Sequence, residues 1–240
     1  MAMNLKVTHV VPRSLRRQVK RILHTLKRQE EKRASDHLVA LGREIAIEPE
    51  ISLNYRYLGQ GDGEWSVCPA NLRKGGICYS FGVGRDVSFD LDLIDQFGMC
   101  VFAFDPTPKS IAWVESVFPT LPTEFRFHPW GVADYDGDAS FHLPPEHGCS
   151  FKMYDGDEEK PPGETSVGKV FRLETTMQRL GHETVDLVKI DIEGAEVSVI
   201  PEIAAMSTRI GQVLVEFHHR MAPDLACGMQ ETRHAIQLLS

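Results

Sequence analysis

Acidic and imidazole side chains follow two mostly apolar segments in the C-terminal half of the sequence. Asp191 and Glu193 come after "VDLVKI", and Glu216 and His218 come after "QVLV". Side chains two residues apart share one face of a strand, so the members of each pair would point the same way. A carboxylate beside an imidazole with a pKa near neutral pH could take a proton from a hydroxyl nucleophile. We therefore predict Asp191, Glu193, Glu216 and His218 as catalytic residues, with His218 as the general base.

These residue types also have structural interpretations. Asp191 could cap the next helix, Glu193 and Glu216 could be ion-paired at a helix start or sheet edge, and the imidazole could serve only the fold. The four side chains would suit Mg or Mn, but no tight ligand spacing supports a metal, and we predict none. Glu196 is expected in solvent, and Lys189 is expected to pair with a carboxylate.

A glycine turn ends the first expected strand. In "SFGVGRDV", Gly82 and Gly84 let the backbone pass close to a ligand. A dinucleotide fingerprint needs a third glycine where Val87 stands, which argues against an NAD-dependent oxidoreductase or epimerase. Asp105 ends the second expected strand, where it could accept hydrogen bonds from both ribose hydroxyls or simply begin a turn before Pro106. A glycine turn with an acidic strand end fits an adenosyl ligand without pyrophosphate, S-adenosylmethionine.

Alternating strands and helices must position these groups. Nearly continuous apolar strands separated by helices predict an α/β fold with a mostly parallel sheet covered by helices on both faces. The expected strands are residues 76–81, 99–105, 125–133, 185–192 and 212–219. Helices are expected between them, from "VSFDLDLIDQF", "KSIAWVESVF", "TTMQRL" and "AEVSVIPEI", and residues 144–166 are expected to be loop.

Five segments in order resemble one family. "YSFGVGRDVSFDLDLI", "VFAFDPTP", "HPWGVAD", "VDLVKIDIEGAE" and "VLVEFHH" are similar to the FkbM-type methyltransferases, a class I S-adenosylmethionine-dependent family with a Rossmann-like sheet. The similarity runs from about Leu58 to His219. It implies that the first turn holds the methionine part of the cofactor, that Asp105 binds the ribose and that Asp191 closes the site. The implied cofactor residues are Ser80, Gly82, Val83, Gly84, Asp86, Asp105, Gly131, Val132, Ala133 and Asp191.

The sequence departs from the family pattern in two places. Ser80 and Asp86 stand where many class I enzymes have an acidic residue and a glycine, so the cofactor's amino group is expected to rest on Asp86 or another carboxylate. A helix expected in "DLACGMQETRHAIQLLS" follows the fifth strand, where the class I sheet usually continues with a sixth and a seventh strand. We expect either a shortened sheet, whose exposed edge a homodimer partner or the N-terminal helix shields, or a sequence truncated from a longer parent.

Several flanking residues could border the site or serve the fold. Trp65 and Trp130 could wall the adenine or the acceptor, but large aromatics near a glycine turn commonly belong to the core. Asp62 and Gly63 could form a lid, and the acidic loop Asp155–Glu159 could order over a substrate or stay in solvent.

The N-terminal segment differs in charge from the rest. Residues 1–44 carry eleven Lys/Arg and four Asp/Glu, against 15 and 30 in the remainder. A helix is expected from Ser14 to Leu41, ended by Gly42, either packed on its own domain or a twin, or docked on a membrane surface or partner. We predict a basic amphipathic extension over residues 1–45 and an S-adenosylmethionine-binding methyltransferase domain over residues 46–240.

Composition bounds the location and the partners. The net charge of −8 disfavours nucleic acid, and no apolar run approaches the length of a membrane span. Five cysteines without a C-x-x-C pair, and no signal-peptide core, predict a cytoplasmic protein with reduced thiols.

The resemblance implies methylation of a hydroxyl on a small-molecule or saccharide acceptor, such as a sugar or a secondary-metabolite intermediate. A hypothesis from another class is a non-catalytic Rossmann-like module that acts in binding or assembly through its basic helix.

Overall fold

The computed structural model of the chain describes residues 29–30, 32–47, 50–143, 152–154, 164–221 and 225–240. The chain divides into two compact units, Met1–Pro49 and Glu50–Ser240. In the first unit, residues 32–40 are helical, and Gly42 at φ 67° follows the helix as expected for a stop signal. The expected helix start at Ser14 lies outside the described residues, as does Cys149.

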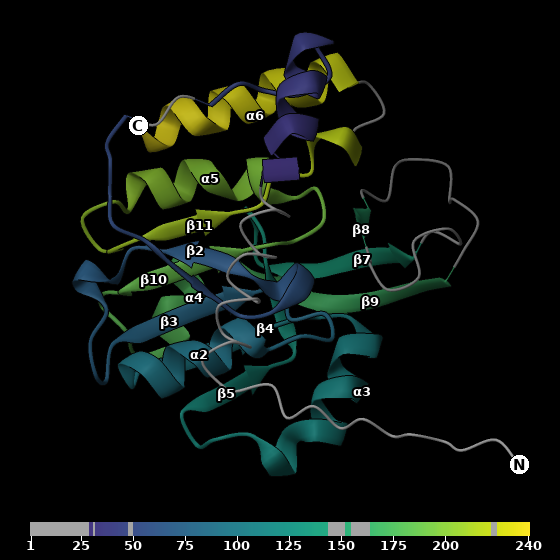
Figure 1. The fold of residues 1–240 in the computed structure, drawn as a ribbon. Helices are drawn as coiled ribbons and strands as arrows, with labels where there is room; N and C mark the ends of the chain where they lie inside the picture. Colours follow the sequence, from purple (N-terminus) through teal and green to yellow (C-terminus); the bar gives the residue numbers. More distant parts are fainter. Residues whose placement is uncertain (1–28, 31, 48–49, 144–151, 155–163, 222–224) are drawn as a thin grey trace, which may run out of the picture. The chain divides into compact units, whose positions relative to one another are not determined.

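A five-stranded parallel sheet forms the centre of the second unit (Figure 1). Its order is β11-β10-β3-β4-β5, so β3 lies in the middle and successive connections leave it in opposite directions. This confirms the predicted α/β sheet and creates a switch point beyond the carboxyl ends of β3 and β10. The strands are β3 (Ile77–Phe81), β4 (Cys100–Phe104), β5 (Phe125–His128), β10 (Leu187–Ile190) and β11 (Val213–Val215).

Helices cover both faces of this sheet, also as predicted. The side chains of α2 and α3 share a buried cluster with Cys78 and Val101, whereas those of α4 and α5 share the opposite cluster with Tyr79 and Phe81. The last helix, α6, lies alongside α5 (Figure 1). The helices are α2 (Ser88–Phe97), α3 (Pro108–Val117), α4 (Leu173–Leu180), α5 (Glu196–Ala205) and α6 (Leu225–Leu239).

A second, four-stranded sheet was not foreseen in full. Its order is β6-β9-β7-β8, with strands β6 (Trp130–Val132), β7 (Gly137–Leu143), β8 (Lys152–Tyr154) and β9 (Glu164–Phe171). The single strand expected over residues 125–133 is wrong, because it breaks at Pro129, which has no N–H to donate to a ladder. The expected loop over residues 144–166 is wrong at 152–154 and 164–166, and its other residues lie outside the described part.

An N-terminal hairpin completes the unit. Strands β1 (Arg56–Leu58) and β2 (Trp65–Val67) pair antiparallel around a short 3-10 turn at Gly61–Gly63. Leu58 and Val67 are buried in the same cluster as α2, which fixes the hairpin beside the first helix of the sheet. The loop between the strands is thereby held near the glycine turn that follows β3.

The fifth strand forms one edge of the sheet in the described part of the chain. All three residues of β11 are partly exposed, and the side-chain amide of Gln212 bonds the backbone N–H of Cys68 at 2.9 Å and its carbonyl at 3.3 Å. Shielding of the β11 edge by a homodimer partner or by the N-terminal helix stays a prediction.

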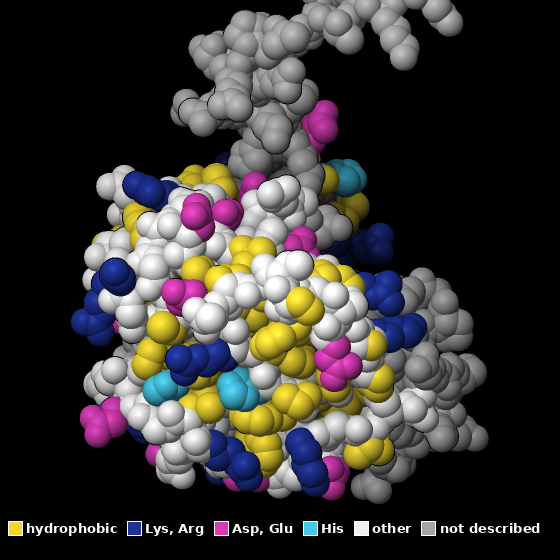
Figure 2. Space-filling view, turned by 90° about the horizontal axis from the view of Figure 1, so that it is seen from below, with side chains coloured by type: hydrophobic (Ala, Val, Ile, Leu, Met, Phe, Trp, Pro, Cys, Tyr) yellow, Lys and Arg dark blue, Asp and Glu magenta, His cyan; other side chains and the backbone are white. Residues whose placement is uncertain are grey.

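The surface, the helices and the cysteines of the described residues bear on the predictions from composition. Figure 2 shows a face on which apolar, basic, acidic and histidine side chains intermix, so the acidic surplus of the chain is not gathered on the described residues there. Among the described helices, none has both the length and the apolar composition that crossing a membrane requires. The described cysteines, Cys68, Cys78, Cys100 and Cys227, are free thiols.

Candidate functional site

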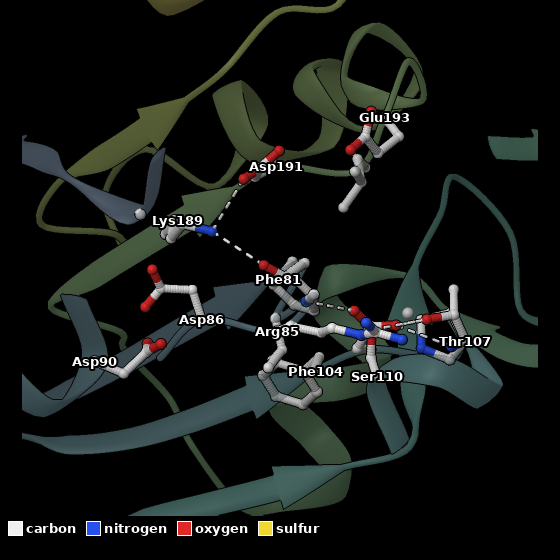
Figure 3. Close-up of a pocket in the computed structure, with 18 of the residues that line it drawn as sticks. Phe81, Arg85, Asp86, Asp90, Phe104, Thr107, Ser110, Lys189, Asp191 and Glu193 are labelled. Carbon is white, nitrogen blue, oxygen red and sulfur yellow. Dashed lines mark hydrogen bonds and ion pairs between the residues drawn. The ribbon is translucent and has the colours of Figure 1, made fainter. Parts of the chain in front are cut away.

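A cavity of about 500 Å³ opens at the carboxyl ends of β3, β4 and β10, at the switch point of the sheet (Figure 3). Four segments build its walls: the glycine turn after β3, the turn after β4, the turn after β10, and the loop of the β1–β2 hairpin. The second sheet adds apolar wall residues. Those are Gly131, Val132, Phe141 and Val170.

The glycine turn touches the end of β10 directly. Gly82 has φ 85°, and a Cβ at this position would overlap the backbone carbonyl oxygen of Asp191. The N–H of Gly82 donates to the backbone carbonyl oxygen of Phe104 at 3.0 Å, and the N–H of Asp191 donates to that of Phe81 at 3.2 Å. Only glycine permits this approach, which brings the ends of β3, β4 and β10 together as the sequence predicted.

Asp105 holds the next turn in place. Its side chain is buried, with Oδ2 accepting the N–H of Gly84 at 3.0 Å. Oδ1 accepts the N–H of Thr107 at 2.9 Å and its hydroxyl at 2.6 Å, and the hydroxyls of Thr107 and Ser110 lie 2.9 Å apart. An ionised carboxylate has about four acceptor positions and three of them are occupied, so Asp105 can accept one further hydrogen bond from a ligand in the cavity.

A carboxylate–imidazole cluster lies at the ends of β10 and β11. Nε2 of His218 is 3.6 Å from Oε2 of Glu193 and 3.8 Å from Oδ1 of Asp191. Nδ1 of the same ring is 2.7 Å from Oε1 of Glu196. Asp191 and Glu193 line the cavity, whereas His218 and Glu216 are not among its lining residues. The predicted catalytic residues are therefore neighbours.

Glu196 is not in solvent, so that expectation is wrong. It is 1% exposed, and Oε1 accepts the backbone N–H groups of Ile192 at 3.2 Å and Gly194 at 3.1 Å. Its side chain folds back over the turn before α5 because the donors of this turn need an acceptor. The N–H of His218 also donates to Oε2 at 3.5 Å, so one carboxylate ties the ends of β10 and β11 together.

These contacts set the charge state of His218. Burial alone would lower its pKa, but the hydrogen bond to Glu196 and the charges of Glu196, Glu193 and Asp191 raise the pKa to about 9. The pKa of Glu196 is lowered, since the bond and charge of His218 outweigh the effect of its burial. His218 is thus an imidazolium at neutral pH, which corrects the expectation of an imidazole with a pKa close to neutrality.

Two further observations concern the same cluster. Glu193 has φ 58°, a left-handed conformation that costs energy for a residue with a Cβ. Within the described part of the chain, ligand atoms of Asp191, Glu193 and His218 all lie within 4.8 Å of one another, a set that could hold a cation. Burial raises the pKa of Glu216, and the charge of Asp191 adds to the shift.

Lys189 pairs with a carboxylate, as expected. Its side chain is buried, and Nζ lies 3.1 Å from the carbonyl oxygen of Gly82 and 3.5 Å from Oδ2 of Asp191 (Figure 3). Nζ also lies 4.8 Å from the ring centre of Trp65, which lines the cavity. Trp130 does not line it and packs against His128 instead.

Some of the other predicted site residues line the cavity, and others do not. Val83, Gly84 and Asp86 line the cavity together with Gly82, but Ser80 and Ala133 are buried beside it and are not lining residues. Gly63 lines it too, while the side chain of Asp62 and the loop Asp155–Glu159 lie outside the described residues. The lining residues Asp90, Thr107 and Ser110 were not predicted from the sequence, because each is of a common type in the first turn of a helix or just before it.

In comparisons with known proteins, the chain matches the model of one protein family. The model of the methyltransferase FkbM domain matches residues 41–240, most of the chain. No curated protein matches the chain significantly.

Proposed function

Because this chain belongs to the FkbM methyltransferase family, we propose that it transfers a methyl group from S-adenosylmethionine to a hydroxyl oxygen of a saccharide or secondary-metabolite acceptor. The observation that carries this proposal is the convergence of Gly82, Asp105 and Asp191 on one cavity. These are the residues that the family resemblance assigns to the methionine part, the ribose and the closing of the site.

The cavity fits such a cofactor in size and polarity. Its volume of about 500 Å³ lies within the usual range for small-molecule sites. Apolar residues, Val132, Phe141 and Val170, offer a surface for the adenine near Asp105. Five acidic and two basic side chains line the cavity, a balance that favours a cation such as a sulfonium. The acids are Asp86, Asp90, Asp105, Asp191 and Glu193, and the bases are Arg85 and Lys189.

Bound S-adenosylmethionine would supply an electrophilic methyl group on a positively charged sulfur. The chain's own part is to align the acceptor oxygen and remove its proton. In this proposal the acceptor hydroxyl donates a hydrogen bond to Asp191 or Glu193 at the cavity wall. The neutral form of His218, whose Nε2 faces both carboxylates, then takes up the proton, and Glu216 adds negative charge behind them.

We propose no metal for this step. At neutral pH, before the reaction, the imidazolium of His218 holds its positive charge 3.6 Å from Glu193 and 3.8 Å from Asp191, which disfavours a divalent cation at the same two carboxylates. A divalent ion that is required for turnover would contradict this part of the proposal.

Calorimetric titration with S-adenosylmethionine and S-adenosylhomocysteine tests cofactor binding first. We expect one site per chain, and a folded sample that binds neither would contradict the proposal and favour the non-catalytic alternative. A screen of sugars and hydroxylated secondary metabolites, followed by detection of S-adenosylhomocysteine, then tests the reaction. Running the screen with Mg²⁺ or with EDTA tests the role of a metal.

A further inference from the structure

Asp90, in the first turn of α2, is a buried carboxylate that its neighbours satisfy only in part. It is 3% exposed and lines the cavity, and its Oδ1 has no hydrogen-bond partner in the described structure. The hydroxyl of Ser80, on β3, is equally buried and makes no hydrogen bond of good geometry, although it lies close enough to Asp90 to lower the pKa of that carboxyl. A buried carboxylate oxygen without a donor is costly, so such a group at a cavity wall points to a ligand that supplies one.

The neighbouring charges do not satisfy Asp90. Lys189 on β10 makes its ion pair with Asp191, and Asp86 in the glycine turn and Cys78 on β3 bring no positive charge. Burial raises the pKa of Asp90 to about 6, and the charge of Lys189 and the nearby hydroxyl of Ser80 offset only part of the effect. In the ligand-free protein this carboxyl therefore titrates just below neutral pH.

The position of Asp90 selects one part of the cofactor. In Figure 3, Asp90 and Asp86 lie together at one end of the cavity, away from Thr107 and Ser110 at the ribose end. A sulfonium cannot donate a hydrogen bond, whereas a primary ammonium has three N–H donors. Asp86 is the alternative that the sequence suggested; its Oδ1 accepts the N–H of Ser88 at 2.7 Å, so its charge is better satisfied than that of Asp90, whose Oδ1 has no hydrogen-bond partner in the described structure.

We propose that Asp90 is the residue that binds the α-ammonium group of the cofactor's methionine part, taking the role of the acidic residue that Ser80 replaces at the end of β3. The inference rests on the proposed function, because it needs an adenosyl amino-acid ligand in this cavity. It makes Asp90 a specificity residue for ligands that carry the amino-acid end.

Two ligands separate this subsite from the rest of the cavity. S-adenosylhomocysteine carries the amino-acid end, and 5′-methylthioadenosine lacks it. In calorimetric titrations at pH 7.5, Asp90→Asn should lower the affinity for S-adenosylhomocysteine by roughly ten- to hundredfold, because a hydrogen bond to a charged group is lost. The same variant should bind 5′-methylthioadenosine as the wild type does. Asp95→Asn, at an exposed position of the same helix, should leave both affinities unchanged.

A pH series gives a second readout. Wild-type affinity for S-adenosylhomocysteine should rise between pH 5 and 7, because the ammonium binds the ionised form of Asp90. Asp90→Asn, and the wild type with 5′-methylthioadenosine, should show no such rise.

Three results would overturn the inference. Equal losses for both ligands in Asp90→Asn would mean that Asp90 only maintains the fold, and an unchanged affinity for S-adenosylhomocysteine would mean that the ammonium binds elsewhere. In either case the proposed function survives. A wild type that binds neither ligand would overturn the proposed function and the subsite together.

Discussion

Nδ1 of His218 and Oε1 of Glu196 lie 2.7 Å apart, with the two side chains 14% and 2% exposed. The two residues are 22 positions apart: Glu196 is the first residue of α5, which follows β10, and His218 follows β11, the neighbouring strand. This contact decides the charge of the imidazole that faces Asp191 and Glu193, and it links stability to pH.

Stability should fall as the pH rises from about 6.5 to about 9. His218 has a pKa raised to about 9 in the folded chain from an ordinary 6.5, so its contribution is complete below 6.5 and is lost as the pH rises through 9. The shift corresponds to on the order of 3 kcal/mol. Glu196, with a lowered pKa, adds stability above its ordinary 4.5 that is lost as the pH falls. Urea unfolding from pH 5 to 9.5 measures the change.

Glu196→Gln is the matched variant for this measurement, because it keeps the size of the side chain and removes its charge. We expect the pKa of His218, followed by NMR titration, to fall and the loss of stability above pH 6.5 to shrink. A wild-type His218 that titrates near 6.5 would contradict the assignment.

Turnover should depend on His218 and rise with pH. His218→Ala should slow methyl transfer by about 10²- to 10⁴-fold, the usual contribution of a general base, with S-adenosylhomocysteine binding retained. Since only the neutral imidazole can accept a proton, the wild-type rate should increase toward pH 9. A variant with a normal rate would show that His218 is not the base. His219→Ala is the control at the adjacent position.

Cofactor affinity should depend on Asp105. Asp105→Ala should weaken the binding of S-adenosylmethionine by roughly tenfold or more, because it removes a ligand hydrogen bond to a charged acceptor and releases the N–H groups of Gly84 and Thr107. Titration calorimetry measures the loss, and circular dichroism checks the fold. Asp138→Ala, in an exposed ion pair on β7, is the control for lost charge. Equal affinities for the two variants would remove Asp105 from the site.

Stability should be sensitive to a methyl group on Gly82. Gly82→Ala meets the carbonyl oxygen of Asp191 at φ 85°, whereas Gly181→Ala at φ 72° meets nothing within 4 Å. The positive φ alone costs about 1–2 kcal/mol in each variant. Thermal unfolding should therefore show a larger drop in melting temperature for Gly82→Ala than for Gly181→Ala. Each kcal/mol of lost stability corresponds to a drop of about 2–4 °C. Equal melting temperatures would mean that the ends of β3 and β10 can separate freely.

Much of the fold followed from the sequence. Apolar strands separated by helices specify a parallel sheet, and the carboxyl ends of its central strands must lie together. For this reason Gly82, Asp105 and Asp191 could be placed at one site from the sequence, and the family match confirms the FkbM-type family. Local pattern was sufficient here, because each element shows its own periodicity and its own turn residues.

The tertiary structure decided what depends on distant neighbours. The burial of Glu196, the raised pKa of His218 and the unpartnered carboxylate of Asp90 arise from groups far apart in the chain, and electrostatic effects depend on distance and solvent exposure in space. Glu196 follows a turn and looks like an exposed helix residue, and Asp90 looks like an ordinary acid in a first helical turn. In the folded chain, Glu196 contacts the imidazole of His218, and Asp90 lies at the wall of the cavity.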